Sequence, residues 1–177
     1  MNELDWIAEG RKLLGVEENA NTSKVVAMWR DGFEASGQAG RMKESVWNTG
    51  STPWCGGFVA ACLARAGLGK HVPKDFPLAR AWAKVGTPLS KPAYGCVVVF
   101  TRDGGGHVGF VVGKDTKDTK GNLMVLGGNQ GNHVCIKPFS KARVLAYRWC
   151  GQTGAPAQGR YDLPLLSSDG KVSTNEA

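Results

Sequence analysis

The chain has 177 residues, 42% of them hydrophobic, which is enough apolar material for one domain with a real core and excludes a wholly disordered chain. The formal net charge of +7 favours an anionic partner such as a nucleic acid, a membrane surface or a bacterial envelope. Because Lys and Arg are scattered, without a basic block or a basic helix interleaved with aromatics, we expect no nucleic-acid binding.

Helical patterns fill the first half of the chain. Apolar residues at helical spacing, together with plausible helix-starting and helix-ending residues, predict helices over residues 4–14, 22–33, 55–66 and 78–85. The Gly-rich polar stretch over 37–52 and the Pro-containing stretch over 71–77 are expected to be loops.

Strand patterns follow in the second half. Runs of β-branched and aromatic residues between Gly, Asp and Lys turns predict strands over 95–101, 107–114, 122–126, 133–137 and 144–149. Helices followed by consecutive short strands predict an α+β fold, in which N-terminal helices pack on an antiparallel sheet. We expect this domain to cover residues 1–150, with residues 151–177 as a loosely ordered C-terminal tail.

The five cysteines form an odd set without Cys-x-x-Cys spacing, which argues against a disulfide framework and against structural zinc. We therefore expect reduced thiols in a chain made in the cytoplasm. The start of the chain is polar and acidic with no apolar segment after it, so no signal peptide is expected. No stretch approaches the ~20 apolar residues that span a bilayer, and we expect no stable membrane insertion.

One cysteine lies in a special setting. In Pro53-Trp54-Cys55, a turn leads directly into a predicted helix, so Cys55 lies at a helix N-terminus. The partial positive charge there is expected to lower the pKa of the thiol below about 8.5, and the unpaired N–H groups can face a developing oxyanion. Gly56 has no side chain, which would let a substrate approach closely. Trp54 either lines the substrate groove or anchors the start of the helix.

Two later residues complete a candidate thiol-hydrolase set. His107 begins a strand after three glycines and suits a general base. Asn129, in a Gly-Gly-Asn-Gln turn, could orient the imidazole, with Gln130, Asn132 and Asp103 as rivals for that task. His133 is a rival base.

The remaining candidates have ordinary structural interpretations. Cys62, Cys96, Cys135 and Cys150 lie in apolar patterns and are expected in the core, as are Trp6, Trp29, Trp82 and Trp149. His71 is expected to be solvated, and Glu17 and Glu18 to cap or to form ion pairs. Three scattered histidines without a His-Glu-x-x-His motif predict no metal site, and no cofactor is expected.

Six stretches of the chain occur in an order typical of one group of enzymes. They are Gly15-Val16-Glu17-Glu18, Pro53-Trp54-Cys55, Ala81-Trp82-Ala83-Lys84-Val85-Gly86, Gly106-His107-Val108-Gly109-Phe110, Leu126-Gly127-Gly128-Asn129-Gln130 and Tyr147-Arg148-Trp149. With them the chain resembles the CHAP/NlpC-P60 superfamily of cysteine peptidases, within it the phage and prophage cell-wall hydrolases.

The resemblance implies a papain-like fold and cleavage of an amide bond in peptidoglycan. It implies Cys55 as nucleophile, His107 as base and Asn129 as the residue that orients the base. Many such domains carry Glu two positions before this Asn, where this chain has Gly127, so the third role is expected to fall to Asn129. The expected substrate-binding residues are Trp54, Gly56 and Gln130.

We therefore expect a monomeric amidase or endopeptidase that acts on the bacterial cell wall in the periplasm. A phage endolysin or a related lytic protein fits, delivered through a holin or by an injection or secretion machine. Two other functions stay open: a wall- or virion-binding module without activity, and a protein-directed toxin with deamidase or transglutaminase-like chemistry.

Overall fold

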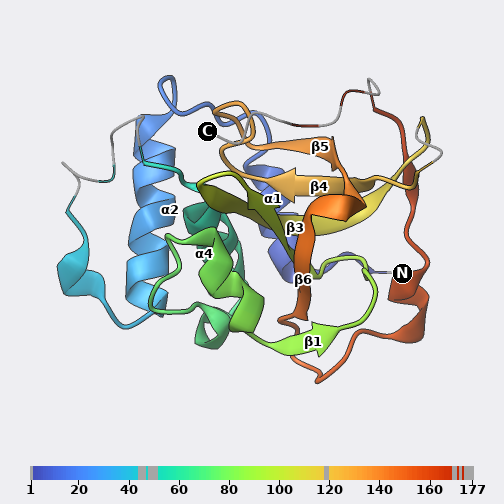
Figure 1. The fold of residues 1–177 in the computed structure, drawn as a ribbon. Coiled ribbons are helices and arrows are strands. Elements are labelled where there is room, and N and C mark those ends of the chain that lie inside the picture. The colour runs from blue at the N-terminus through green and yellow to red at the C-terminus, as the bar shows by residue number, and fades with distance from the viewer. Residues whose placement is uncertain are drawn as a thin grey trace.

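The computed structural model describes residues 2–43, 47, 52–117, 120–168, 171 and 173, and it consists of helices packed on one sheet (Figure 1). The α-helices are α1 (Asp5–Lys12), α2 (Thr22–Ala35) and α4 (Cys55–Arg65). The 3-10 helices are η1 (Ala39–Arg41), η2 (Gly69–His71), η3 (Ala79–Lys84), η4 (Lys141–Arg143) and η5 (Gln158–Tyr161). The strands are β1 (Thr87–Leu89), β2 (Val97–Arg102), β3 (Gly105–Asp115), β4 (Leu123–Gly127), β5 (Cys135–Phe139), β6 (Val144–Trp149) and β7 (Leu165–Leu166). The predicted α+β class is confirmed.

The sheet has seven strands, in the order β1-β6-β2-β3-β4-β5, with β7 paired to β3. All pairings are antiparallel except that of β7 with β3, which is parallel. The strands β2, β3 and β4 are rich in fully buried Val, Leu and Phe, so the centre of the sheet is part of the core. The five predicted strands are present, and β1 and β7 are additional.

Helix α4 is the central helix of the core and carries Cys55 at its first position. It contacts α1, α2 and β3, and every residue from Cys55 to Leu63 is buried. Small side chains make this packing feasible. A Cβ added to Gly57 would lie 3.2 Å from the ring of Trp29 on α2, so the glycine lets the two helices approach each other.

Two predicted segments differ in detail. Residues 79–84 form a 3-10 helix rather than an α-helix, held by the Trp82 indole N–H, which donates to the carbonyl of Phe76 at 3.0 Å. The predicted loop over 37–52 contains the short helix η1, and its residues 44–46 and 48–51 lie outside the described part of the chain.

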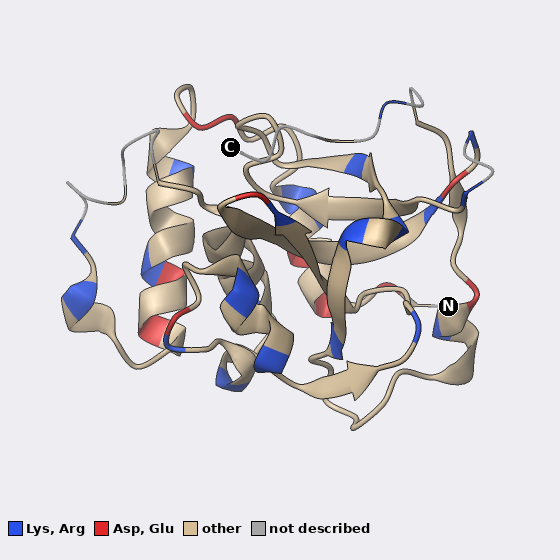
Figure 2. Ribbon diagram, in the orientation of Figure 1, with Lys and Arg blue, Asp and Glu red and all other residues tan. Residues whose placement is uncertain are grey.

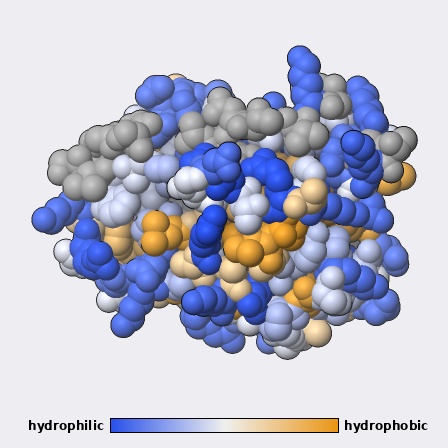
Figure 3. Space-filling view, viewed as in Figure 1, coloured by the Kyte–Doolittle hydropathy of each residue, from blue (hydrophilic) through white to orange (hydrophobic). Residues whose placement is uncertain are grey.

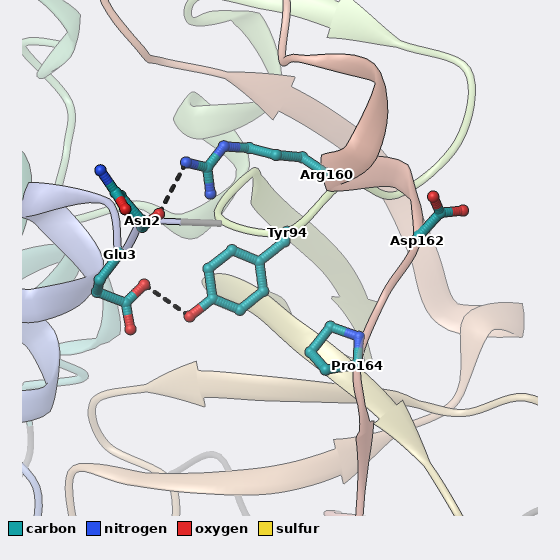
Figure 4. A pocket seen from close by; sticks show the side chains of 6 residues that line it. All are labelled: Asn2, Glu3, Tyr94, Arg160, Asp162 and Pro164. Carbon is teal, nitrogen blue, oxygen red and sulfur yellow. Dashed lines mark hydrogen bonds between the residues drawn. The ribbon is translucent and has the colours of Figure 1, made fainter.

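Residues 151–168 were expected to belong to a loosely ordered tail, but they pack along the domain. The backbone N–H of Lys114 donates to the Pro164 carbonyl at 2.8 Å, and the Ser168 hydroxyl donates to the Asp115 carboxylate at 2.6 Å. Near the N-terminus, the Arg160 guanidinium donates to the carbonyl of Asn2 at 3.0 Å (Figure 4). This segment thus adds strand β7 to the sheet and contacts the N-terminal residues through Arg160.

Lys and Arg residues are spread over the helices and the sheet rather than gathered in one block (Figure 2). Across the same face, apolar side chains form a broken band bordered by hydrophilic ones (Figure 3). In the described part of the chain, no helix has the length and apolarity needed to cross a membrane.

Candidate active site

Cys55 lies where α4 meets the beginning of β3. Its side chain is 2% exposed, and the backbone N–H of Val108 lies close enough to the sulfur to lower the pKa of the thiol. Val108 directly follows His107 in β3, and β4 ends at Gly127, before it would pair with this part of β3. The structure therefore brings the predicted nucleophile to the strand that carries the predicted base.

Burial decides the charge state of the isolated thiol. It raises the pKa of Cys55, while the N–H groups of Val108, Gly56 and Cys55 itself and the charge of Arg102 act in the opposite direction. The expectation that the helix N-terminus alone lowers this pKa is corrected, because the cost of burying a thiolate is larger than the stabilisation by these groups. The same N–H groups nevertheless surround the sulfur as donors for a negative charge.

His107 is fully buried and held in a row of aromatic rings. Its ring stacks on that of Phe139, with centroids 5.1 Å apart and an interplanar angle of 4°, and Phe139 stacks on Phe100 at 4.8 Å. Stacking fixes the plane of the imidazole, so its nitrogen atoms point in defined directions along that plane.

Gln130 contacts one nitrogen of the imidazole. Its Oε1 lies 3.1 Å from His107 Nε2, and its Nε2 donates to the carbonyl of Cys135 at 2.8 Å. Gln130 itself is 2% exposed, so this network is shielded from water. The sequence indicated two roles for Gln130, orienting the base and contacting the substrate. Its contact with His107 favours the first role.

Asn129 does not make the predicted contact. It occupies the left-handed region at φ 58°, and its Oδ1 is buried without a hydrogen-bond partner in the described part of the chain. The space beside Gly127 explains why Gln130, rather than Asn129, contacts the imidazole of His107. A Cβ added there would lie 2.5 Å from Gln130 Oε1 and 3.2 Å from His107 Nε2, so the glutamine amide fills the position that a side chain at 127 would need.

The three residues expected to bind substrate, Trp54, Gly56 and Gln130, are all buried. Trp54 is 1% exposed and anchors the start of α4, the second of its two interpretations. At Gly56 an added Cβ would lie 2.0 Å from the carbonyl oxygen of Phe76, so the glycine lets these two backbone segments approach each other. Gln130 faces His107 instead of the surface.

A buried acid beside Trp54 was not expected from the sequence. Glu18 is 6% exposed, and burial raises the pKa of its carboxyl, while the nearby indole N–H of Trp54 lowers it. The two groups lie side by side, although their alignment falls outside good hydrogen-bond geometry. The backbone N–H of Glu18 donates to the carbonyl of Asn132 at 3.0 Å, which ties this segment to the turn that contains Gln130.

The other rivals lie elsewhere. His133 is exposed and its Nδ1 contacts the Gly131 carbonyl at 2.7 Å, and Asp103 is exposed in the turn between β2 and β3. His71, expected to be solvated, is partly buried, and this burial lowers its pKa. Cys135, expected in the core, is half-buried and contacts Gln130.

A separate pocket lies where the N-terminal residues meet Tyr94 and the segment from Arg160 to Pro164 (Figure 4). It has a volume of about 270 Å³ and is lined by Asn2, Glu3, Tyr94, Arg160, Asp162 and Pro164, none of which belongs to the site around Cys55. Among the described residues, no group of three or more His, Cys, Asp and Glu side chains is placed to hold a metal ion.

Comparison with known proteins gives one match. A family model described as the CHAP domain matches residues 47–136, slightly more than half of the chain, and this range includes Cys55, His107, Asn129 and Gln130. No curated protein and no solved structure matches the chain.

Proposed function

The chain belongs to the CHAP domain family, and from that premise we propose that it hydrolyses an amide bond of peptidoglycan with Cys55 as nucleophile and His107 as general base. The observation that carries this proposal is the position of the Cys55 sulfur, at the first residue of α4 and beside the N–H of Val108, the residue after His107. A thiol, an imidazole and several N–H donors are thereby supplied by two adjoining elements.

In the acylation step, the Cys55 sulfur attacks the carbonyl carbon of the amide while its proton passes to His107. Direct formation of a free thiolate is disfavoured by burial, so transfer to the neighbouring imidazole is the way to charge the sulfur. The carbonyl oxygen becomes negative, and the N–H groups at the start of α4 can stabilise it. His107 then gives the proton to the leaving amine, and a thioester remains.

In the deacylation step, a water molecule replaces the amine. His107 removes a proton from this water, the hydroxide attacks the thioester carbon, and the sulfur leaves as the carboxylic acid forms. The proton on His107 returns to the sulfur, which restores the starting state. The net reaction is hydrolysis of one amide bond.

For the biological role, we propose a lytic protein of the phage-endolysin type that acts on the wall as a monomer. A net charge of +7 supports attraction to an anionic envelope. Delivery would need a holin or a secretion machine, and the role in lysis is tested by adding the protein to cells with and without a permeabilised outer membrane.

One observation favours a second candidate, a wall-binding module without activity. The Cys55 side chain is only 2% exposed and burial raises its pKa, which are also the properties of an inert core thiol. Such a module would bind purified walls without releasing amino groups. A protein-directed deamidase would instead release ammonia from a protein target and leave the wall intact.

The test is mass analysis of purified peptidoglycan after incubation with the wild type, Cys55→Ala and Cys62→Ala. Cys62 is a matched control because it lies on the same helix, is fully buried and has a pKa that burial raises strongly. The proposal expects new fragments with the wild type and with Cys62→Ala but not with Cys55→Ala. Equal fragments from Cys55→Ala, or none from the wild type, would contradict it.

A further inference from the structure

The Gln130 side chain that contacts His107 is a neutral amide, although a carboxylate at this position could also accept the proton of the imidazole N–H. We propose that Gln130 is the positioning residue for His107, which holds a proton on Nε2 and so places the lone pair of the neutral ring on Nδ1. This inference rests on the proposed function, because it assigns the residue that prepares the general base of that reaction.

The orientation of the Gln130 amide follows from its other contacts. Its nitrogen lies 2.8 Å from the carbonyl of Cys135 and 3.4 Å from the carbonyl of Val125. Both of these groups are acceptors only, so the NH₂ end of the amide must face them. Oε1 is therefore the atom that faces His107, and a ring nitrogen 3.1 Å from a carbonyl oxygen must donate a proton to it.

The amide cannot easily turn or withdraw. The backbone N–H of Gln130 donates to the carbonyl of His133 at 3.0 Å, which closes the turn, and the side chain is 2% exposed. On the other side, the His107 ring is stacked on Phe139. A Cβ at position 127 would lie 2.5 Å from Gln130 Oε1, so the glycine at 127 leaves the space that the Gln130 amide occupies.

A neutral positioning residue has a chemical consequence. An amide fixes the tautomer and orientation of the ring, but it brings no full negative charge to the imidazolium that forms when Cys55 is deprotonated. The ion pair of sulfur and imidazolium is then stabilised by the N–H groups around Cys55 and by the charge of Arg102, with no carboxylate on the imidazole side in the contact that Gln130 makes. A carboxylate in place of the amide should extend the pH range over which this ion pair persists.

The experiment measures two quantities for the wild type, Gln130→Ala, Gln130→Glu and Asn129→Gly. The first is the rate of Cys55 alkylation by iodoacetamide as a function of pH, followed by peptide mass analysis, which needs no substrate. The second is kcat and KM on soluble peptidoglycan fragments. Asn129→Gly is the matched variant because it removes the neighbouring side chain, and glycine tolerates the φ of 58°.

We expect Gln130→Ala to lower kcat roughly 10- to 100-fold with little change in KM, the effect of leaving a buried hydrogen-bonding group without its partner. Asn129→Gly should lose less. Gln130→Glu should make Cys55 alkylation begin at a lower pH than in the wild type, because its carboxylate stabilises the imidazolium and with it the ion pair. A merely structural role for Gln130 would change thermal stability but leave the shape of this pH profile unchanged.

Gly127→Ala gives an independent check that does not alter Gln130. Its Cβ should displace the amide and reduce kcat, and in a Gln130→Ala background it should add little, because both changes act through one contact. The proposal is overturned if Asn129→Gly loses more kcat than Gln130→Ala, if the alkylation profile of Gln130→Glu matches the wild type, or if wild-type Cys55 is not alkylated at any pH. A wild type that cleaves no wall but shows the expected alkylation profiles would overturn the peptidoglycan function and leave the role of Gln130 standing.

Discussion

Replacing Gly56 by Ala tests the packing that holds the nucleophile. The new Cβ would lie 2.0 Å from the carbonyl oxygen of Phe76, whereas ordinary contact begins at 3.4 Å, so this backbone must move by 1.4 Å (3.4 − 2.0). That carbonyl also accepts the indole N–H of the fully buried Trp82 at 3.0 Å, and the movement would break this hydrogen bond.

Two costs follow. Overpacking of this size costs about 2 kcal/mol, and leaving the buried indole without an acceptor costs about 2 kcal/mol more. A loss of about 4 kcal/mol corresponds to a drop in Tm of roughly 8–16 °C for a chain of this length. Differential scanning calorimetry and urea unfolding would measure it, and activity should fall as well because Gly56 adjoins Cys55.

Gly40→Ala is the control for this prediction. Gly40 is exposed in η1, and a Cβ there has nothing within 4 Å, so the substitution should change stability by less than about 0.5 kcal/mol. A difference in Tm of less than about 2 °C between Gly56→Ala and Gly40→Ala would be far smaller than the drop expected above. It would mean that the backbone at Phe76 moves without strain, and the reasoning would be refuted.

Four other predictions concern pH, the tail and a buried thiol. Burial raises the folded-state pKa of Glu18, so its ionisation destabilises the fold, and Glu18→Gln should gain stability relative to the wild type as pH rises. The N–H groups of Ala20 and Asn19 lower the pKa of Glu17, so Glu17→Gln should cost most near neutral pH and least in acid, which urea unfolding between about pH 3 and pH 7 would measure. Ending the chain before Pro164 should expose an edge of β3, lower Tm and cause association visible by light scattering. Cys96, whose pKa is raised by burial to about 12, should resist iodoacetamide at pH 8 until urea unfolds the protein, and rapid labelling in the native state would contradict its position in the core.

The sequence predicted the elements whose patterns are long and regular. Helix α2 repeats apolar residues at the period of a helix, and strands β2 and β3 contain continuous runs of β-branched and aromatic residues that are buried in the fold. Strand β7 has only two residues, too few to show a period, and it exists because β3 offers an edge to pair with. Its position depends on tertiary contacts that no local pattern contains.

In the candidate site, too, the sequence pattern indicated some residues, whereas others depend on the tertiary structure. The settings of Cys55 and His107 could be predicted because Cys55 begins α4 and His107 lies close to the start of β3, each after a turn. The choice between Asn129 and Gln130 was not visible, because it depends on the backbone at Asn129. With φ at 58° the chain reverses its course, so the alternation of side chains expected for a strand does not apply, and the next residue points at the base.

The contact between Arg160 and Asn2 has a consequence for how the protein reaches its final state. These residues are 158 positions apart, and the backbone N–H of Tyr94, midway along the chain, donates to the carbonyl of the same Arg160. Closing such long loops is entropically costly and slows folding, so these contacts should form late. During synthesis on the ribosome, the helices and central strands can associate early, but the edge of β3 stays open until the last part of the chain has emerged. Conditions that prolong this interval should therefore increase the aggregation of newly made protein more than they unfold protein that has already folded.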